Sequence, residues 1–82
     1  MNQRQIAIAK QRIEQFYESK RLADYICREE GPRLIEAATQ TISLRELGRK
    51  TGLSSTYLSM AKTGKTVLST AAFLKIANEV SQ

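Results

Sequence analysis

Apolar residues recur at helical spacing along most of the chain, and no segment shows the strict alternation of a half-buried strand. The clearest helix is C-terminal, where apolar residues fall at i, i+3, i+4 and i+7, at Phe73, Ile76, Ala77 and Val80. This spacing predicts an amphipathic helix with one buried face. Ser69 precedes this segment and can cap the helix. The pattern predicts an all-α protein whose last helix closes the core.

Residues 43–64 predict two short helices joined by a tight turn. Ser43 and Glu46 have the S-x-x-E spacing of a capping box, so a helix is expected to begin just after Ser43. Gly52 is suited to end that helix, because glycine adopts a left-handed backbone conformation at little cost. Ser54 can cap the second helix.

The N-terminal half reads as helical over residues 2–30, which contain neither glycine nor proline. Gly31 and Pro32 form the strongest break in the chain, because glycine suits a helix C-terminus and proline the first turn of the next helix. A short helix is expected over 32–40. The sequence therefore predicts a bundle of about five helices with an extra long N-terminal helix.

Two apolar stripes in the N-terminal helix lie on nearly opposite sides, so one straight helix cannot bury both against a single surface. Either the helix breaks near Ser19–Lys20 and folds back into one monomer, or its halves face different partners. In the second case, Leu22 to Ile26 would pack on the chain's own core. The first stripe would meet another chain through Ile6, Ile13, Phe16 and Tyr17. The division predicted is an arm over 1–30 and a domain over 31–82.

The segment from Ser43 to Val80 resembles the phage-repressor type of helix-turn-helix, the Cro/cI/XRE-like family with a lambda-repressor-like fold. The residues that carry the resemblance are Leu47, Gly48, Gly52, Leu53, Leu58, Ser59 and Gly64. The helix after the motif also resembles its counterpart in the family. Two positions depart from the family pattern. Gly48 stands where alanine is usual, and Lys62 stands where an acidic residue is common. A glycine inside a helix costs about 0.8–1 kcal/mol, which predicts unusually close packing at that point.

The resemblance implies that the second helix of the motif enters a DNA major groove. Its outer face carries small polar residues edged by cations, which suits that role. The residues expected to contact bases are Ser55, Thr56, Tyr57, Ser59 and Met60. Those expected to contact phosphates are Arg45, Arg49, Lys50, Lys62 and Lys65. Alternatively, the hydroxyl groups only cap and solvate a surface helix, and Arg49 and Lys50 only complement the helix dipole.

Composition narrows the functional classes. The 82 residues carry a formal net charge of +5, which favours a polyanionic partner. There is no histidine and one cysteine, Cys27, so the sequence offers no zinc site, disulfide framework or Cys/His nucleophile pair. We expect no cofactor and no enzymatic activity. The lone thiol and the lack of an apolar run of ~20 residues indicate a cytoplasmic protein, at the nucleoid of a bacterial or phage-infected cell, without a membrane partner.

Three functional hypotheses follow. The first is a sequence-specific regulator of transcription that binds double-stranded DNA, acts as a repressor and forms a homodimer. A dimer is expected because one short helix reads few base pairs and two-fold pairing doubles the site. The second is a protein-interaction module whose N-terminal helix binds a partner protein. The third is an antitoxin-like component that binds both DNA and a toxin.

Overall fold

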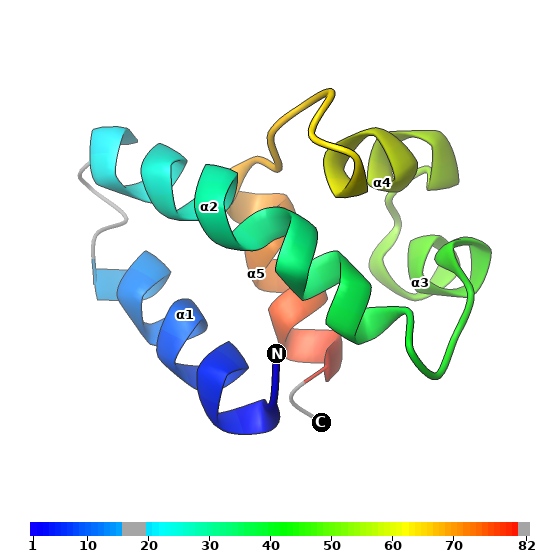
Figure 1. Cartoon of the computed structure of the whole chain (residues 1–82), viewed down its shortest axis with the longest axis horizontal. Coiled ribbons are helices and arrows are strands. Elements are labelled where there is room, and N and C mark those ends of the chain that lie inside the picture. The colour runs from blue at the N-terminus through cyan, green and yellow to red at the C-terminus, as the bar shows by residue number, and fades with distance from the viewer. Residues whose placement is uncertain (16–19, 81–82) are drawn as a thin grey trace.

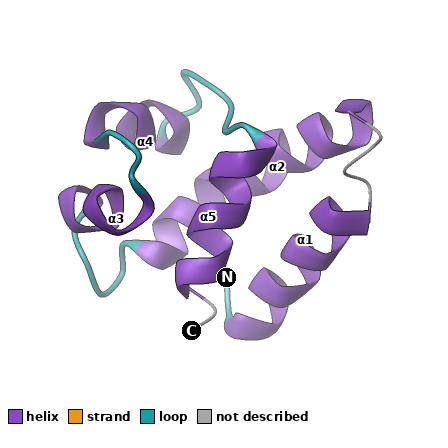
Figure 2. Cartoon of the chain, turned by 180° about the vertical axis from the view of Figure 1, so that it is seen from behind, coloured by secondary structure: helices purple, strands orange, loops and turns teal. Residues whose placement is uncertain are grey.

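The structure, a computed structural model, describes residues 1–15 and 20–80 and is all-helical across them (Figure 1). The helices are α1 (Gln3–Gln15), α2 (Lys20–Ala38), α3 (Leu44–Thr51), α4 (Ser55–Lys62) and α5 (Thr70–Val80). The predicted all-α class is confirmed, and these ranges contain no strand (Figure 2). The expectations for Phe16, Tyr17 and a break beginning at Ser19 lie outside the described residues.

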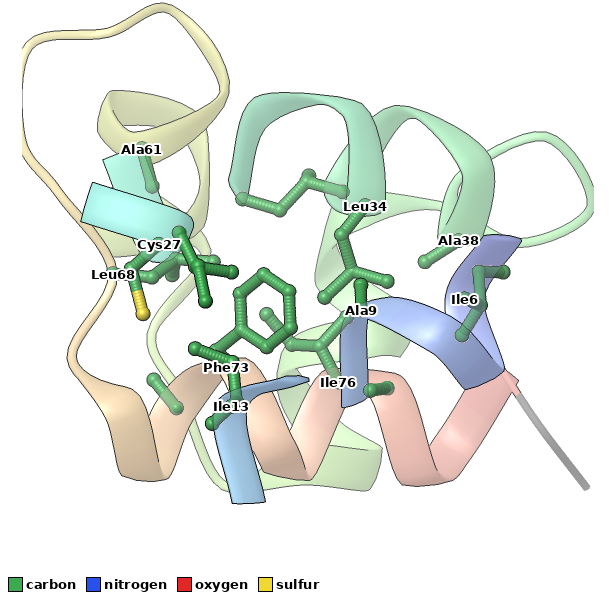
Figure 3. Close-up of a cluster of buried hydrophobic side chains, with 14 of the residues drawn as sticks. Ile6, Ala9, Ile13, Cys27, Leu34, Ala38, Ala61, Leu68, Phe73 and Ile76 are labelled. Atoms are coloured by element: carbon green, nitrogen blue, oxygen red, sulfur yellow. The ribbon is translucent and has the colours of Figure 1, made fainter. Parts of the chain in front are cut away.

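The core is built around α5, which packs against α1, α2 and α3, while α4 packs against α2 and α3. The Phe73 ring lies in the centre of the buried cluster, with Ile13, Cys27, Leu34 and Ile76 around it (Figure 3). All five side chains are no more than 1% exposed. The apolar stripe predicted for the last helix therefore faces the core. The Ser69 hydroxyl caps this helix, as expected, by accepting a hydrogen bond from the Ala72 N–H.

The predicted helix break at Gly31–Pro32 is wrong, because α2 runs without interruption through both residues. Its buried positions continue in one helical register on both sides of the proline, at Ala23, Ile26, Cys27, Leu34, Ile35 and Ala38. Proline leaves the carbonyl of Arg28 without its usual helical donor, but Arg28 lies on the exposed side, where water can replace it. Tertiary burial therefore outweighs a local helix-breaking signal.

The predicted long N-terminal helix is also wrong, because the described chain has two helices there, and α1 lies back against α2 and α5 (Figure 1). Ile6 and Ile13 are 1% and 0% exposed within this one chain. They are therefore not available as a seam with a second chain in this structure. The first stripe is therefore buried within one monomer at Ile6, Ala9 and Ile13, as in the folded-back alternative. Helix α2 crosses the expected boundary between residues 30 and 31, and α1 contributes to the same buried cluster as α5.

The expectation that Leu22 and Tyr25 pack on the core together with Ile26 holds only for Ile26. Leu22 is 45% exposed and Tyr25 is 58% exposed. The core face of α2 is rotated toward Ala23 and Cys27, because α4 and α5 cover that side of the helix.

The N-terminus of α1 is fixed by side-chain hydrogen bonds. The Asn2 side chain accepts from the Gln5 backbone N–H, and the Gln5 side chain accepts from the Asn2 backbone N–H, both at 2.9 Å. This reciprocal pair satisfies N–H groups that a helix N-terminus otherwise leaves free. Gln3 also donates to the Val80 carbonyl at 2.7 Å, which ties the start of α1 to the end of α5.

A pair of isoleucines on α1 tests this packing. Ile13→Ala should lower the free energy of unfolding by about 2–5 kcal/mol, because it leaves a cavity beside Phe73. Ile8→Ala should change it by less than about 0.5 kcal/mol, since Ile8 is 47% exposed on the same helix. Urea denaturation measures both values. If Ile13→Ala left stability unchanged and instead weakened self-association, α1 would belong to an interface between chains.

Candidate nucleic-acid interface

The start of α3 is capped as the sequence predicts, but only half of the capping box forms. The Ser43 hydroxyl accepts from the Glu46 backbone N–H at 3.1 Å. The Glu46 carboxylate does not complete the reciprocal bond and instead accepts two hydrogen bonds from the Arg49 guanidinium, one of them at 3.2 Å from Nε. The Arg49 hydrogen bond also lowers the pKa of Glu46 below its ordinary value. Arg49 therefore already has an anionic partner within α3.

The turn between α3 and α4 approaches α3 very closely at Gly48. A Cβ atom at this position would lie 2.5 Å from the Leu53 carbonyl oxygen, nearer than real Cβ atoms come to another atom. Gly52 has a φ of 77°, the left-handed conformation expected of a glycine that ends a helix. Only glycine fits at Gly48 without displacing the turn, which accounts for a glycine inside this helix.

Thr51 and Leu53 fix the inner side of the turn. The buried Thr51 hydroxyl donates to the Leu47 carbonyl at 2.8 Å and accepts from the Leu53 N–H at 3.4 Å. Leu53 is half-buried and packs against the core. These bonds leave the chain positioned for Ser54 to begin the next helix. Sequence reasoning missed the role of Thr51, because a threonine at a helix end is common and only its burial distinguishes it.

The orientation of α4 is set by one cap and two buried side chains. The Ser54 hydroxyl accepts from the Tyr57 backbone N–H at 3.0 Å. Leu58 and Ala61 are 0% and 1% exposed and face the other helices. Because α4 buries this side, its opposite side faces outward.

The outer face of α4 carries four of the five residues predicted to contact bases. Ser55, Thr56, Ser59 and Met60 are all exposed, and Met60 is 40% exposed. On a helix, Ser55 and Ser59 lie one turn apart, as do Thr56 and Met60, so the four side chains form two adjacent rows. The surface therefore presents three hydroxyl groups and one thioether within two turns.

Tyr57 differs from these four residues. It is half-buried against the core, and its hydroxyl accepts a hydrogen bond from the Ser69 backbone N–H at 3.0 Å. This bond links α4 to the residue that caps α5. The structure thus gives Tyr57 a part in holding the loop between α4 and α5. The sequence offers no signal for this contact, because the two residues are twelve positions apart.

Two lysines lie at the C-terminal end of α4. Gly64 has a φ of 82°, and the Lys65 backbone N–H donates to the Met60 carbonyl at 2.9 Å, so the chain turns back over the last turn of the helix. Lys62 and Lys65 are both exposed there. Cations at this position complement the negative end of the helix dipole and are also free to meet an external anion.

At the other end of α4, exposed cations lie on α3. Arg45 is exposed there, as is Arg49, which holds Glu46. A surface hollow of about 480 Å³ lies between α3 and the start of α4. It is lined by Arg45, Gly48, Arg49, Gly52, Leu53, Ser54 and Ser55. Predicted phosphate-contacting residues therefore flank the outer face of α4 at both ends. Lys50 is also exposed, but it lines a different hollow that includes Glu79 and Val80 and no residue of α4.

We also searched the described residues for a metal site, a reactive cysteine and a membrane-spanning helix. Within 1–15 and 20–80, no group of three or more His, Cys, Asp or Glu side chains could hold a metal ion. Burial raises the pKa of the Cys27 thiol, although a hydrogen bond with Thr70 opposes this, so the buried thiol stays protonated at neutral pH. None of the described helices has the length and apolar character that a bilayer span requires.

Comparison of the chain with protein-family models, curated proteins and solved structures found no match. The resemblance to the phage-repressor family therefore rests on the residues of Ser43–Val80 themselves. The functional argument rests on the surface of α4 and its surroundings.

Two glycines test the close approach in the turn. Gly48→Ala should lower the free energy of unfolding by about 1–3 kcal/mol, because the added methyl group meets a backbone carbonyl that cannot move aside freely. Gly31→Ala is the matched control. Its Cβ would lie 3.4 Å from the Leu68 side chain, an ordinary contact, so it should cost nothing and gain up to about 1 kcal/mol of helix propensity. Thermal or urea unfolding gives both values, and a stabilised Gly48→Ala variant would refute the close approach.

Proposed function

We propose that this chain is a sequence-specific regulator of transcription, a repressor, that binds double-stranded DNA with α4 in the major groove. The observation that carries the proposal is that α4 is amphipathic, with one buried face and one exposed polar face. Leu58 and Ala61 anchor its inner face, while its outer face bears small polar side chains that no other part of the described chain covers. In this proposal α3, the turn after it and α4 form a helix-turn-helix.

The outer face of α4 has the chemistry to read base edges. The hydroxyl groups of Ser55, Thr56 and Ser59 can donate or accept, so they can pair with several bases in the major groove. Met60 adds an apolar contact suited to a thymine methyl group. Hydroxyl groups discriminate weakly when alone, so specificity would come from several of these contacts together.

Phosphate contacts would position the helix and supply most of the affinity. Lys62 and Lys65 lie at one end of α4, and Arg45 lies on α3 near the other, where it lines a hollow with Ser54 and Ser55. Binding through such cations releases counterions from DNA and therefore weakens as salt concentration rises. Lys50 lines a different hollow, beside Glu79 and Val80, and is therefore a weaker candidate. Arg49 is also a weaker candidate, because its guanidinium would have to leave or share the Glu46 carboxylate.

The alternatives that use the N-terminal helix to bind a partner protein have less support. They need the stripe that contains Ile6 and Ile13 to be available, and both side chains are buried against the chain's own helices. By contrast, no helix of the described chain covers the outer face of α4, where Ser55, Thr56, Ser59 and Met60 are exposed.

The test is selection from a pool of random duplex DNA at two salt concentrations, with two matched variants. The wild-type chain should enrich an inverted repeat. Lys62→Ala should weaken binding to all sequences alike and reduce the salt slope by about one. Thr56→Ala should keep the salt slope and relax preference at one position of each half-site. Salt-sensitive binding without an enriched motif would contradict sequence-specific regulation, and no binding at either salt concentration would contradict DNA binding altogether.

A further inference from the structure

An uncovered surface lies on the first half of α2. Here Leu22 and Tyr25 are 45% and 58% exposed, although both are large and largely apolar. Arg21, Asp24 and Arg28 surround them at helical spacing and are also exposed. Arg21, Asp24, Tyr25 and Arg28 line a surface hollow of about 560 Å³. We use the name α2 patch for the five exposed residues Arg21, Leu22, Asp24, Tyr25 and Arg28.

The α2 patch carries both signs of charge. Asp24 lies three residues after Arg21 and four before Arg28, so one carboxylate stands between two guanidinium groups beside the Tyr25 ring. In the described part of the chain, Asp24 forms no ion pair with either arginine. The charges on this surface are therefore available to groups outside the chain.

A patch of this kind fits a second copy of itself. In an isologous interface the same surface meets itself across a two-fold axis, so a patch with both signs of charge can pair opposite charges with its own copy. Here Asp24 of one copy can face an arginine of the other, while the apolar side chains meet near the axis. A purely acidic or purely basic partner would instead place a like charge against part of the patch.

The position of the patch leaves the candidate nucleic-acid interface free. The first half of α2 lies at one end of the molecule, and α3 and α4 lie at the other end (Figure 1). Figure 2, the view from behind, shows the same separation. Two copies joined at the patch would keep both α4 helices uncovered, as reading two half-sites requires.

We propose that the α2 patch is the surface through which two copies of this chain associate, with Asp24 of each copy opposite an arginine of the other. The inference rests on the proposed function in that the dimer would bind two half-sites of DNA. It also replaces the seam on α1, which the fold of the single chain buries.

Charge exchange tests the proposal by sedimentation equilibrium of the full chain. Asp24→Arg makes the patch wholly basic, and the double change Arg21→Asp with Arg28→Asp makes it wholly acidic. Each variant alone should have a dimer dissociation constant raised about tenfold or more, because like charges then face each other. An equimolar mixture of the two should dimerise again. Ile8→Arg, an exposed change on α1, should leave the dissociation constant unchanged, and circular dichroism checks that every variant keeps its helices.

Three results would overturn the proposal: a wild-type chain that stays monomeric, charge variants that dimerise like the wild type, or a mixture that stays monomeric. Binding of the same proteins to selected duplex DNA separates this proposal from the proposed function. A monomeric wild type that still selects a half-site would remove the α2 dimer and keep DNA recognition. A dimer that responds to charge exchange and binds no DNA would keep the interface and remove the proposed function.

Discussion

The structure depends on the close approach between Gly48 and the Leu53 carbonyl oxygen. Without a Cβ atom in the way, the turn lies against α3 and Leu53 is drawn into the edge of the core. Ser54 is then placed to cap α4, and Leu58 reaches its buried position. The direction in which the polar face of α4 points depends on this close approach together with the Ser54 cap and the burial of Leu58 and Ala61.

The second constraint is the supply of apolar cover for a small core. In a chain of 82 residues, few side chains are available to cover the buried face of α5, which includes Phe73, Ile76 and Ala77. Helix α1 provides that cover through Ile6, Ala9 and Ile13, and Gln3 ties it to the end of α5. Helix α1 therefore completes the core on one side of the molecule, while α3 and α4 present the candidate interface on the other (Figure 1).

Local features could be predicted from the sequence, and long-range ones could not. The caps at Ser43, Ser54 and Gly52 depend on residues three or four positions apart, so their spacing is enough to identify them. The path of α2 through Pro32 depends on burial against α4 and α5, which overrides the local signal. At the candidate site, helical spacing was enough to predict that Ser55, Thr56 and Ser59 lie on the exposed face of α4. The bond from Ser69 to Tyr57 joins residues twelve positions apart and required the folded chain. The Glu46 carboxylate has two local partners within reach, the Ser43 N–H and the Arg49 guanidinium, and spacing alone does not choose between them.

The central claim is that the outer face of α4 is the surface that meets DNA. The most direct measurement is a titration of the ¹⁵N-labelled chain with duplex DNA, followed by the shifts of backbone amide signals. The account predicts the largest changes within Ser55–Lys62 and at Lys65, with little change along α1. Changes centred on α1 or on the α2 patch, with α4 unaffected, would contradict it.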